Sequence, residues 1–392
     1  MTTLAQGTAN IRFNQLGEQH GLSNNHINTI IKDSTGFLWF GTSTGLNRYD
    51  GQQIKIFRHA NTDQTSIKDN NILDLLIGPH QTLWVRTRNG FNIYQAQNET
   101  FIRNADSVLK SYDIPPGIIR QIIKDQQGNY WFLNESAGLY RYNPQKKEST
   151  RYVSKHNALI TAIALTDSQG VQLIYSNGLL ERVDQITLLP SYQQVRQVKT
   201  SYNQANYKLF LDSSGDLWVY AVDVPIGVYC IKKGNKSEAI HIDKNNKQIA
   251  LNTDAVVNIT EDENKNIWLA TDHGGINLLN KKTSQISYLL HDDTNSSSIA
   301  QNSTIALYKD DQHIIWVGTY KQGVSYYHKQ LLMFPLIRRQ NGLPFEDVNR
   351  FVEDPHGNLW IGTNGGGVIY FDRKRNHFTQ YQNTPNNPKS LT

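Results

Sequence analysis

All the tryptophans of this 392-residue chain occupy one position of a recurring segment. The first copy begins at Asp33 and reads DSTGFLWFGTSTGLNRYD, with an acid, a glycine turn, a tryptophan, a Gly-Thr pair and a terminal aromatic. The seven tryptophans are Trp39, Trp84, Trp131, Trp218, Trp268, Trp316 and Trp360. Because chance does not place every tryptophan in this way, the chain must be an array of similar units.

One further copy lacks the tryptophan. It reads DSQGVQLIYSNGLLERVD from Asp167, and we expect Leu173 to take the tryptophan position. With Leu173 included, successive copies are 45, 47, 42, 45, 50, 48 and 44 residues apart. The acid stands six residues before this position in every copy that has it, and the second copy has Gly78 in its place.

Each copy reads as four short antiparallel strands. In the first copy we expect strands at 27–32, 38–42, 46–49 and 54–58, with a tight turn from Asp33 to Gly36. An aspartate at the turn accepts backbone N–H bonds, and a glycine can adopt positive φ. Four-stranded repeats of about 45 residues predict an all-β fold, a β-propeller of four-stranded antiparallel blades. Each tryptophan would then be a wedge between neighbouring blades.

The loops before the copies bear on the number of blades. Residues 13–27 and 334–348, before the first and last copies, share a Phe followed by a Gly-Leu step, whereas copies two and seven follow NTDQTSIKDNNI and DTNSSSIAQNSTI. The final residues NTPNNPKSLT are of the second kind. We therefore predict a seven-bladed propeller over residues 11–335 and the first blade of a second, truncated propeller over residues 336–392. The alternative is an eight-bladed ring, closed by an N-terminal strand near residues 11–16.

Composition excludes some classes of function. The chain has 39 Lys and Arg against 34 Asp and Glu, and the charges are scattered, so we expect no nucleic-acid partner. A lone cysteine, Cys230, can form no internal disulfide and is expected to be a buried small hydrophobe. The N-terminus is not a signal peptide, and no apolar run is long enough to span a membrane. Either the protein is cytosolic or the chain is a fragment.

We expect the repeated motif residues to be scaffold and the functional residues to be those that differ between copies. In propellers these lie in loops at one mouth of the ring, here the loops between the second and third strands and those between the fourth strand and the next blade. The first set departs most from the repeat. The candidates are Arg86, Arg88, Asn134, Glu135, Asp223, Asp272, His273, Tyr320, Lys321 and Asn364. A rim of mixed charge suits a small polar ligand such as a sugar, an amino acid or a short peptide.

Catalytic patterns are weak. The chain has no HExxH, CxxC or GxSxG motif and no phosphate-binding glycine loop, so we expect no catalytic residue, metal or cofactor. Asp272 and His273 are an adjacent acid and histidine, but neighbouring residues on a strand face opposite sides. A lyase resembling the streptogramin-cleaving propellers, with His273 as its best candidate, is one alternative function. A protein-interaction platform is another.

The repeats resemble the two-component regulator propeller repeat, with its acid, Gly, Leu-Trp, Gly-Thr, Gly-Leu and Tyr-Asp elements. The stretches DSTGFLWFGTSTGLNRYD and DPHGNLWIGTNGGGVIYFD match this pattern nearly throughout. The resemblance implies a non-enzymatic, ligand-sensing region on the periplasmic or extracellular side of a bacterial inner membrane, with an oligosaccharide or peptide as ligand. It also implies a longer, membrane-anchored and dimeric protein, with a histidine kinase or diguanylate cyclase module beyond this chain.

Overall fold

The computed structural model describes residues 11–166, 170–190, 196–198, 202–234, 239–329, 337, 339, 342–375 and 377–391. Over these residues the chain is all-β, as predicted, with eight four-stranded antiparallel sheets. One short α-helix, α1 (Asp106–Ser111), and the 3-10 turns Glu18–His20 and Pro79–Gln81 lie between strands. No helix in these ranges has the length and apolar character needed to cross a membrane.

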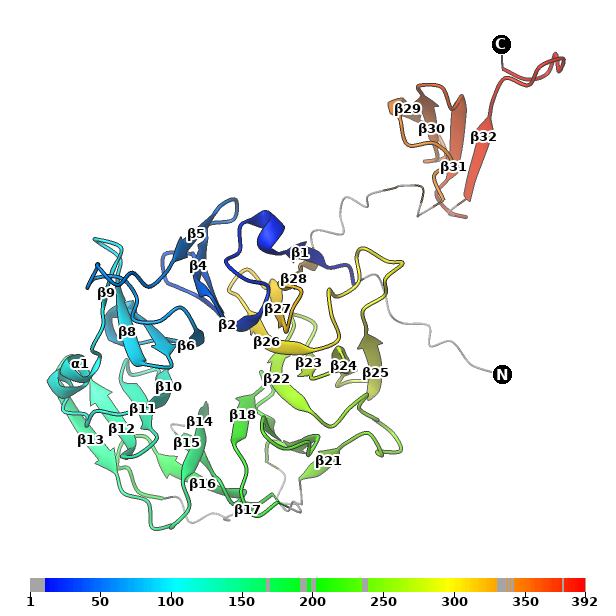
Figure 1. Cartoon of the computed structure of the whole chain (residues 1–392). Coiled ribbons are helices and arrows are strands. Elements are labelled where there is room, and N and C mark those ends of the chain that lie inside the picture. The colour runs from blue at the N-terminus through cyan, green and yellow to red at the C-terminus, as the bar shows by residue number, and fades with distance from the viewer. Residues whose placement is uncertain are drawn as a thin grey trace. The chain divides into compact units, whose positions relative to one another are not determined.

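The chain divides into two compact units, Met1–Lys329 and Gln330–Thr392, and each is described by itself. In the first unit, described sheets surround a common axis (Figure 1), and we number them blades 1 to 7 in chain order. Their inner strands are β2 (Ile27–Lys32), β6 (Ile72–Ile77), β10 (Ile119–Lys124), β14 (Ile160–Thr166), β18 (Tyr207–Leu211), β22 (Val256–Glu261) and β26 (Thr304–Lys309).

The other strands follow outward in chain order. The second strands are β3 (Leu38–Thr42), β7 (Leu83–Thr87), β11 (Tyr130–Asn134), β15 (Gly170–Tyr175), β19 (Leu217–Ala221), β23 (Asn266–Thr271) and β27 (Ile315–Thr319). The third strands are β4 (Gly45–Tyr49), β8 (Gly90–Gln95), β12 (Gly138–Asn143), β16 (Leu179–Asp184), β20 (Val228–Ile231), β24 (Ile276–Asn280) and β28 (Val324–Tyr327). The outer strands are β5 (Ile54–Phe57), β9 (Thr100–Ile102), β13 (Glu148–Tyr152), β17 (Arg196–Gln197), β21 (Ile240–Ile242), β25 (Gln285–Leu289) and, in blade 7, β1 (Asn14–Leu16).

Strand β1 joins the two ends of the first unit. It pairs with β28, with Asn14 opposite Tyr326 and Leu16 opposite Val324. Phe13, just before it, is 4% exposed and lies edge-on to Trp268 of blade 6. The N-terminal strand is therefore the outer strand of blade 7, and blade 7 also packs against the inner strand of blade 1 through the Ile27 and Trp316 cluster. The alternative of an eight-bladed ring gives an N-terminal strand this closing role, but in a ring that also includes the last copy.

The tryptophans of the first unit are wedges between blades, as expected. Trp39 is fully buried and shares a cluster with Ile72 and Leu75 of the next blade. Its ring lies 4.8 Å from that of Tyr94 in blade 2. Cys230 is also buried, and burial raises the pKa of its thiol to about 11. Large rings at each interface thus hold the blades together.

Blade 4 corrects one sequence assignment. In blades 1, 2, 3, 6 and 7 the tryptophan pairs with the fifth residue of the inner strand, as Trp131 does with Ile123. In blade 4 that partner is Ala164, and the residue opposite it is Gln172, not Leu173. Leu173 is one position further along. The hairpin of blade 4 continues toward its turn as far as the pair Thr166 and Gly170. The motif of this copy is therefore displaced by one residue relative to the strand pairing of the other blades. Asp167 lies outside the described residues.

The second unit is one sheet of four strands, β29 (Val348–Glu353), β30 (Leu359–Thr363), β31 (Val368–Asp372) and β32 (His377–Tyr381). Leu343, Ile361, Ile369 and Phe371 form its small core. Every residue of β29 is exposed, and Trp360 is 39% exposed where its counterparts in the first unit are at most 3% exposed. The predicted domains, 11–335 and 336–392, stay predictions, since residues 330–336 lie outside the described ranges.

Candidate functional site

The two ends of each blade carry different parts of the repeat. In an antiparallel four-stranded sheet, the turns after the first and third strands lie at one end, and the loops after the second and fourth strands lie at the other. The motif acids occupy the first of these ends. The predicted site residues belong to the second, which we call the variable rim.

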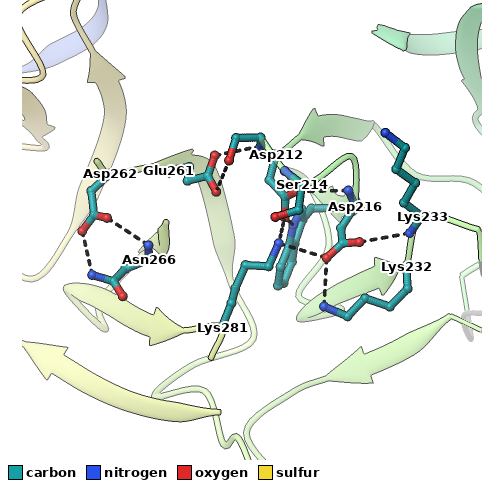
Figure 2. Close-up of polar contacts among 11 residues, drawn as sticks. Asp212, Ser214, Asp216, Lys232, Lys233, Glu261, Asp262, Asn266 and Lys281 are labelled. Carbon is teal, nitrogen blue, oxygen red and sulfur yellow. Dashed lines mark hydrogen bonds and ion pairs between the residues drawn. The ribbon is translucent and has the colours of Figure 1, made fainter. Parts of the chain in front are cut away.

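The motif acids are structural. Asp212, whose side chain is fully buried, accepts hydrogen bonds from Nε1 of Trp218 at 2.8 Å and from the backbone N–H of Ser214 at 2.9 Å. Lys281 of blade 6 forms ion pairs with both Asp212 and Asp216 of blade 5 (Figure 2). Burial alone would raise the pKa of Asp216, but hydrogen bonds from Lys233 N–H, Lys232 and Lys281 outweigh it and lower the pKa to about 2. These contacts fasten one blade to the next.

Asn134 is not available to a ligand at the rim. It is 1% exposed, and its Nδ2 donates to Pro115 O at 3.0 Å. Its Oδ1 accepts from the backbone N–H groups of Ser136 and Ala137, at 3.1 and 3.2 Å. The residue stands where Thr42 stands in blade 1, at the end of the second strand, and it holds its own loop. This differs from the sequence-based expectation.

Asp272 and His273 lie close together instead of on opposite sides of a strand. His273 has a φ of 63°, and its Nδ1 is 2.9 Å from Oδ1 of Asp272. The expectation of opposite faces was wrong because the two residues form a bend rather than an extended strand. The imidazole is 83% exposed and the carboxylate 49% exposed.

Tyr320 and Lys321 lie beside His26, between blades 7 and 1. The Tyr320 ring lies 4.7 Å from that of His26, and Nζ of Lys321 lies 5.2 Å from the centre of the Tyr320 ring. Burial, together with the charge of Lys321, lowers the pKa of His26 despite a hydrogen bond with Asn28 that raises it. Arg88 is exposed on the loop between β7 and β8. Asn364 is in the second unit, where it donates to Asp347.

Three other predicted residues join a charged network at the centre of the first unit. Arg86 Nη2 lies 3.8 Å from Oδ2 of Asp74, and Glu135 accepts a 2.9 Å hydrogen bond from Arg120. Arg120 of blade 3 also donates to Oδ1 of Asn206, at the start of blade 5. Both carboxylate oxygens of Asp223 accept from the backbone N–H of that asparagine, at 2.8 and 2.9 Å. The network therefore spans blades 2, 3 and 5.

The inner strands place charges from different blades in one layer. We define this layer by strand pairing. It contains, from each blade, the inner-strand residue that lies opposite the next-to-last residue of the second strand. Asp74 lies opposite Arg86 in this way, and Lys208 lies opposite Tyr220. The members of the layer are Thr29, Asp74, Gln121, Ala162, Lys208, Asn258 and Ala306. Asp74 and Lys208 are the charged members, and they belong to blades 2 and 5.

Burial and the neighbouring charges both shift the pKa values of Asp74 and Lys208. Burial raises the pKa of Asp74, and Arg86 and Lys208 partly offset that rise. Burial lowers the pKa of Lys208, with Asp74 opposing this effect and Arg120 and Arg86 adding to it. The Arg86 and Asp74 side chains still keep 31% and 32% of their exposure.

Sequence reasoning missed Asp74, Arg120 and Lys208. Each interrupts the apolar pattern of an inner strand, in ILDLLI, IRQIIK and YKLFL, and that interruption is the signal that could have identified them. Among the described residues, no group of three or more His, Cys, Asp or Glu side chains is placed to hold a metal.

A polar cluster also lies between blades 3 and 4. The hydroxyls of Tyr152 and Tyr175 both donate to Oε2 of Glu181, which is 6% exposed, the first at 2.7 Å. His156 Nε2 lies 3.5 Å from the other carboxylate oxygen. Both donors are buried tyrosines, and burial raises the pKa of each. The cluster packs beside Trp131 where blade 4 has no tryptophan of its own.

Comparison with known families confirms the resemblance of the repeats. The family model described as two component regulator propeller matches residues 21–44 and 342–365. Each segment begins before one of the two motif copies that match the pattern best, at Asp33 and Asp354, and overlaps its first half. The fold is therefore that of a β-propeller, and two of its segments match the two-component regulator propeller repeat.

This chain spans only part of the length of the histidine kinase and of the hybrid two component system domain that it matches, and the solved structures have low sequence identity to it. A 65-residue segment is 38% identical to histidine kinase P4 of Formosa agariphila and covers 17% of this chain but 5% of that kinase. The extracellular domain of a hybrid two component system of B. thetaiotaomicron superposes with a TM-score of 0.63 at 18% identity, over 96% of this chain and 55% of that one. A streptogramin B lyase structure has a TM-score of 0.54 at 13% identity, over 81% of this chain and 97% of that one. At these identities the two structures share the fold with this chain.

Proposed function

We propose that the first unit is a non-catalytic ligand-sensing module, and that it binds a small polar ligand, such as an oligosaccharide or a peptide, at its variable rim. The observation that carries this proposal is the convergence of Arg86, Asp74, Arg120 and Lys208 from three blades at the ring axis. The repeat does not require these charges, because other blades have Gly41 or Leu133 at the position of Arg86, and blade 4 has Ala162 at the position of Asp74 and Lys208.

The setting of the module is part of the proposal. The matching repeats and the likeness to an extracellular domain of a hybrid two component system support a sensor region of a longer signalling protein. In that protein the propeller would lie on the periplasmic or extracellular side of a bacterial inner membrane. The full-length protein would be anchored in the membrane and dimeric. Its signalling module, a histidine kinase or a diguanylate cyclase, would lie outside the present chain.

We also propose that the second unit is the first blade of a second propeller. Support comes from its uncovered inner strand β29, where Phe351 and Val352, on opposite faces of the sheet, are 72% and 63% exposed. In blade 1 the matching inner-strand residues are Ile30, which is 7% exposed, and the half-buried Ile31. Neighbouring blades on the two sides would bury these faces in the same way.

Thermal-shift screening tests the sensor proposal. The purified chain is heated with oligosaccharides, amino acids and short peptides, and a ligand at 100 times its Kd should raise the free energy of unfolding by ~2.7 kcal/mol. The shift should fall in an Arg120→Gln variant. It should persist in Lys146→Gln, a matched loss of charge on the exposed turn between β12 and β13. A panel in which nothing stabilises the chain would count against the proposal.

A further inference from the structure

Two cations of the central network lack a direct hydrogen-bond partner. The 3.8 Å separation of Arg86 Nη2 from Asp74 is too long for a hydrogen bond. Nε of Arg86 is buried and has no hydrogen-bond partner among the described residues. Lys208 acts on Asp74 through its charge, with no hydrogen bond or ion pair to any described side chain. Buried donors in this state are costly unless something else accepts from them.

The charges around these donors do not balance. Glu135 is paired with Arg120 at 2.9 Å, so that pair is neutral in sum. Asp74 then faces both Arg86 and Lys208. Two cations therefore face this one carboxylate, in a place where burial already disfavours uncompensated charge.

The scaffold does not require an arginine at position 86. In blades 1 and 7 the equivalent residues are Gly41 and Gly318, and a Cβ there would come within 2.7 Å of a side-chain carbon of the adjoining blade. Blade 3 has Leu133 and blade 6 has Ala270. Lys208 occupies a layer position that Ala162 and Ala306 fill elsewhere. The two cations are therefore additions to the repeat rather than parts of it.

We propose that Arg86 and Lys208 form a binding site for the carboxylate of a small ligand. This inference rests on the proposed sensor function and narrows its ligand to a carboxylate-bearing molecule. A guanidinium presents its N–H groups in a fork that matches the two oxygens of a carboxylate, and a lysine adds a point charge from the facing blade. Asp74 opposes the ligand and limits its affinity.

The ligand could be an acidic sugar or a simple organic acid, because both present the same group. Isothermal titration calorimetry with galacturonate and its di- and trisaccharides, with acetate and succinate, and with the neutral galactose series distinguishes them. Binding of the acidic sugars alone identifies a uronate-containing glycan, and equal binding of acetate and succinate identifies the carboxylate by itself. In either case, added salt should weaken binding, because it screens the partly exposed charges.

Three variants test the roles of the residues: two should weaken carboxylate binding and the third should strengthen it. Arg86→Leu, which copies Leu133, and Lys208→Ala, which copies Ala162, should each weaken carboxylate binding about 10-fold or more. Asp74→Asn should strengthen it about 3- to 10-fold, because it removes a negative charge beside the ligand. Lys146→Gln should leave affinity unchanged. If Arg86→Leu fails to fold, Arg86→Gly copies Gly41 instead.

The failures of the two proposals are distinguishable. If neutral sugars bind as tightly as acidic ones and the three variants change nothing, this inference is overturned and the sensor proposal stands. If Asp74→Asn weakens carboxylate binding, the inference is also overturned, since the cluster would then be a structural ion network. If no carboxylate binds at millimolar concentration while a neutral ligand does, the inference fails alone.

Discussion

Nε1 of Trp131 donates a hydrogen bond to Oδ2 of Asp125 at 2.9 Å, and both residues are buried. The same bond joins Trp39 to Asp33, Trp218 to Asp212, Trp268 to Asp262 and Trp316 to Asp310, at 2.7 to 3.0 Å. The turn folds the acid back across the hairpin, which is why the acid stands six residues before the tryptophan. In blade 2 the tryptophan donates to Thr82 instead, and a Cβ on Gly78 would lie 2.2 Å from its Nε1.

Replacing one of these acids should destabilise the first unit. Asp125→Ala leaves the buried Trp131 N–H without an acceptor and removes the bond from the backbone N–H of Asn129, so we expect a loss of about 2–3 kcal/mol in the free energy of unfolding. Urea denaturation followed by circular dichroism measures it. The control is Asp354→Ala in the second unit, where Asp354 accepts from its turn but no bond from Trp360 is present among the described residues. Equal stability of Asp125→Ala and the parent chain would contradict this role.

Replacing Trp39 by alanine should lower the free energy of unfolding more than replacing Trp360. Trp39 is fully buried, and Trp39→Ala should lower the free energy of unfolding by about 3–5 kcal/mol. Trp360 is 39% exposed, so Trp360→Ala should cost less than about half of that. In a longer chain that contains the next blade, the two costs should converge. A large cost of Trp360→Ala in the present chain would argue against an uncovered face on the second unit.

Strand β1 should be needed for the stability of the first unit. Phe13 packs edge-on to the rings of Trp268 and Tyr327, with centroids 6.3 and 6.4 Å away. Phe13→Ala should cost about 3–4 kcal/mol. A chain that begins at Glu18 loses this side chain and the pairing with β28, and it exposes a strand edge. Limited proteolysis should then cut blade 7 first. The exposed Val153→Ala is the control, and unchanged proteolysis of the shortened chain would refute the prediction.

The repeat alone predicted most of the scaffold. In blade 1 the expected strands 27–32, 38–42, 46–49 and 54–58 compare with Ile27–Lys32, Leu38–Thr42, Gly45–Tyr49 and Ile54–Phe57. The assignment failed by one residue in blade 4. There the tryptophan is absent, and only the pairing of Ala164 with Gln172 reveals the register.

The candidate site was harder to predict. The positions of Arg86 and Glu135 followed from their departures from the repeat, but their partners Asp74 and Arg120 lie on inner strands. A register shift between Ile119 and Gln121 adds one residue to that strand, so alternation along the sequence does not tell which side chains face the axis. Lys208 lies more than 130 residues from Asp74, and only the arrangement of blades around the axis brings their charges together.

The titration of Asp74 should lower the free energy of unfolding as pH rises. Most Asp and Glu side chains raise it instead, because their pKa values are lower in the folded state. Burial raises its pKa, so the folded chain holds this proton more tightly than the unfolded chain does. Its stabilising contribution is full below about pH 4 and is lost as pH rises through the folded pKa, by up to about 1.4 kcal/mol per pH unit. Asp74→Asn should therefore gain stability relative to the parent chain as pH rises from about 4 to 7, in urea denaturation at each pH.

Asp50→Asn is the matched control of opposite sign. Hydrogen bonds from Gln53 N–H and Gln52 N–H lower the pKa of Asp50, so its contribution to stability is lost as pH falls. Parallel stability profiles for Asp74→Asn and the parent chain would show that Asp74 titrates alike in both states and is not desolvated at the ring axis.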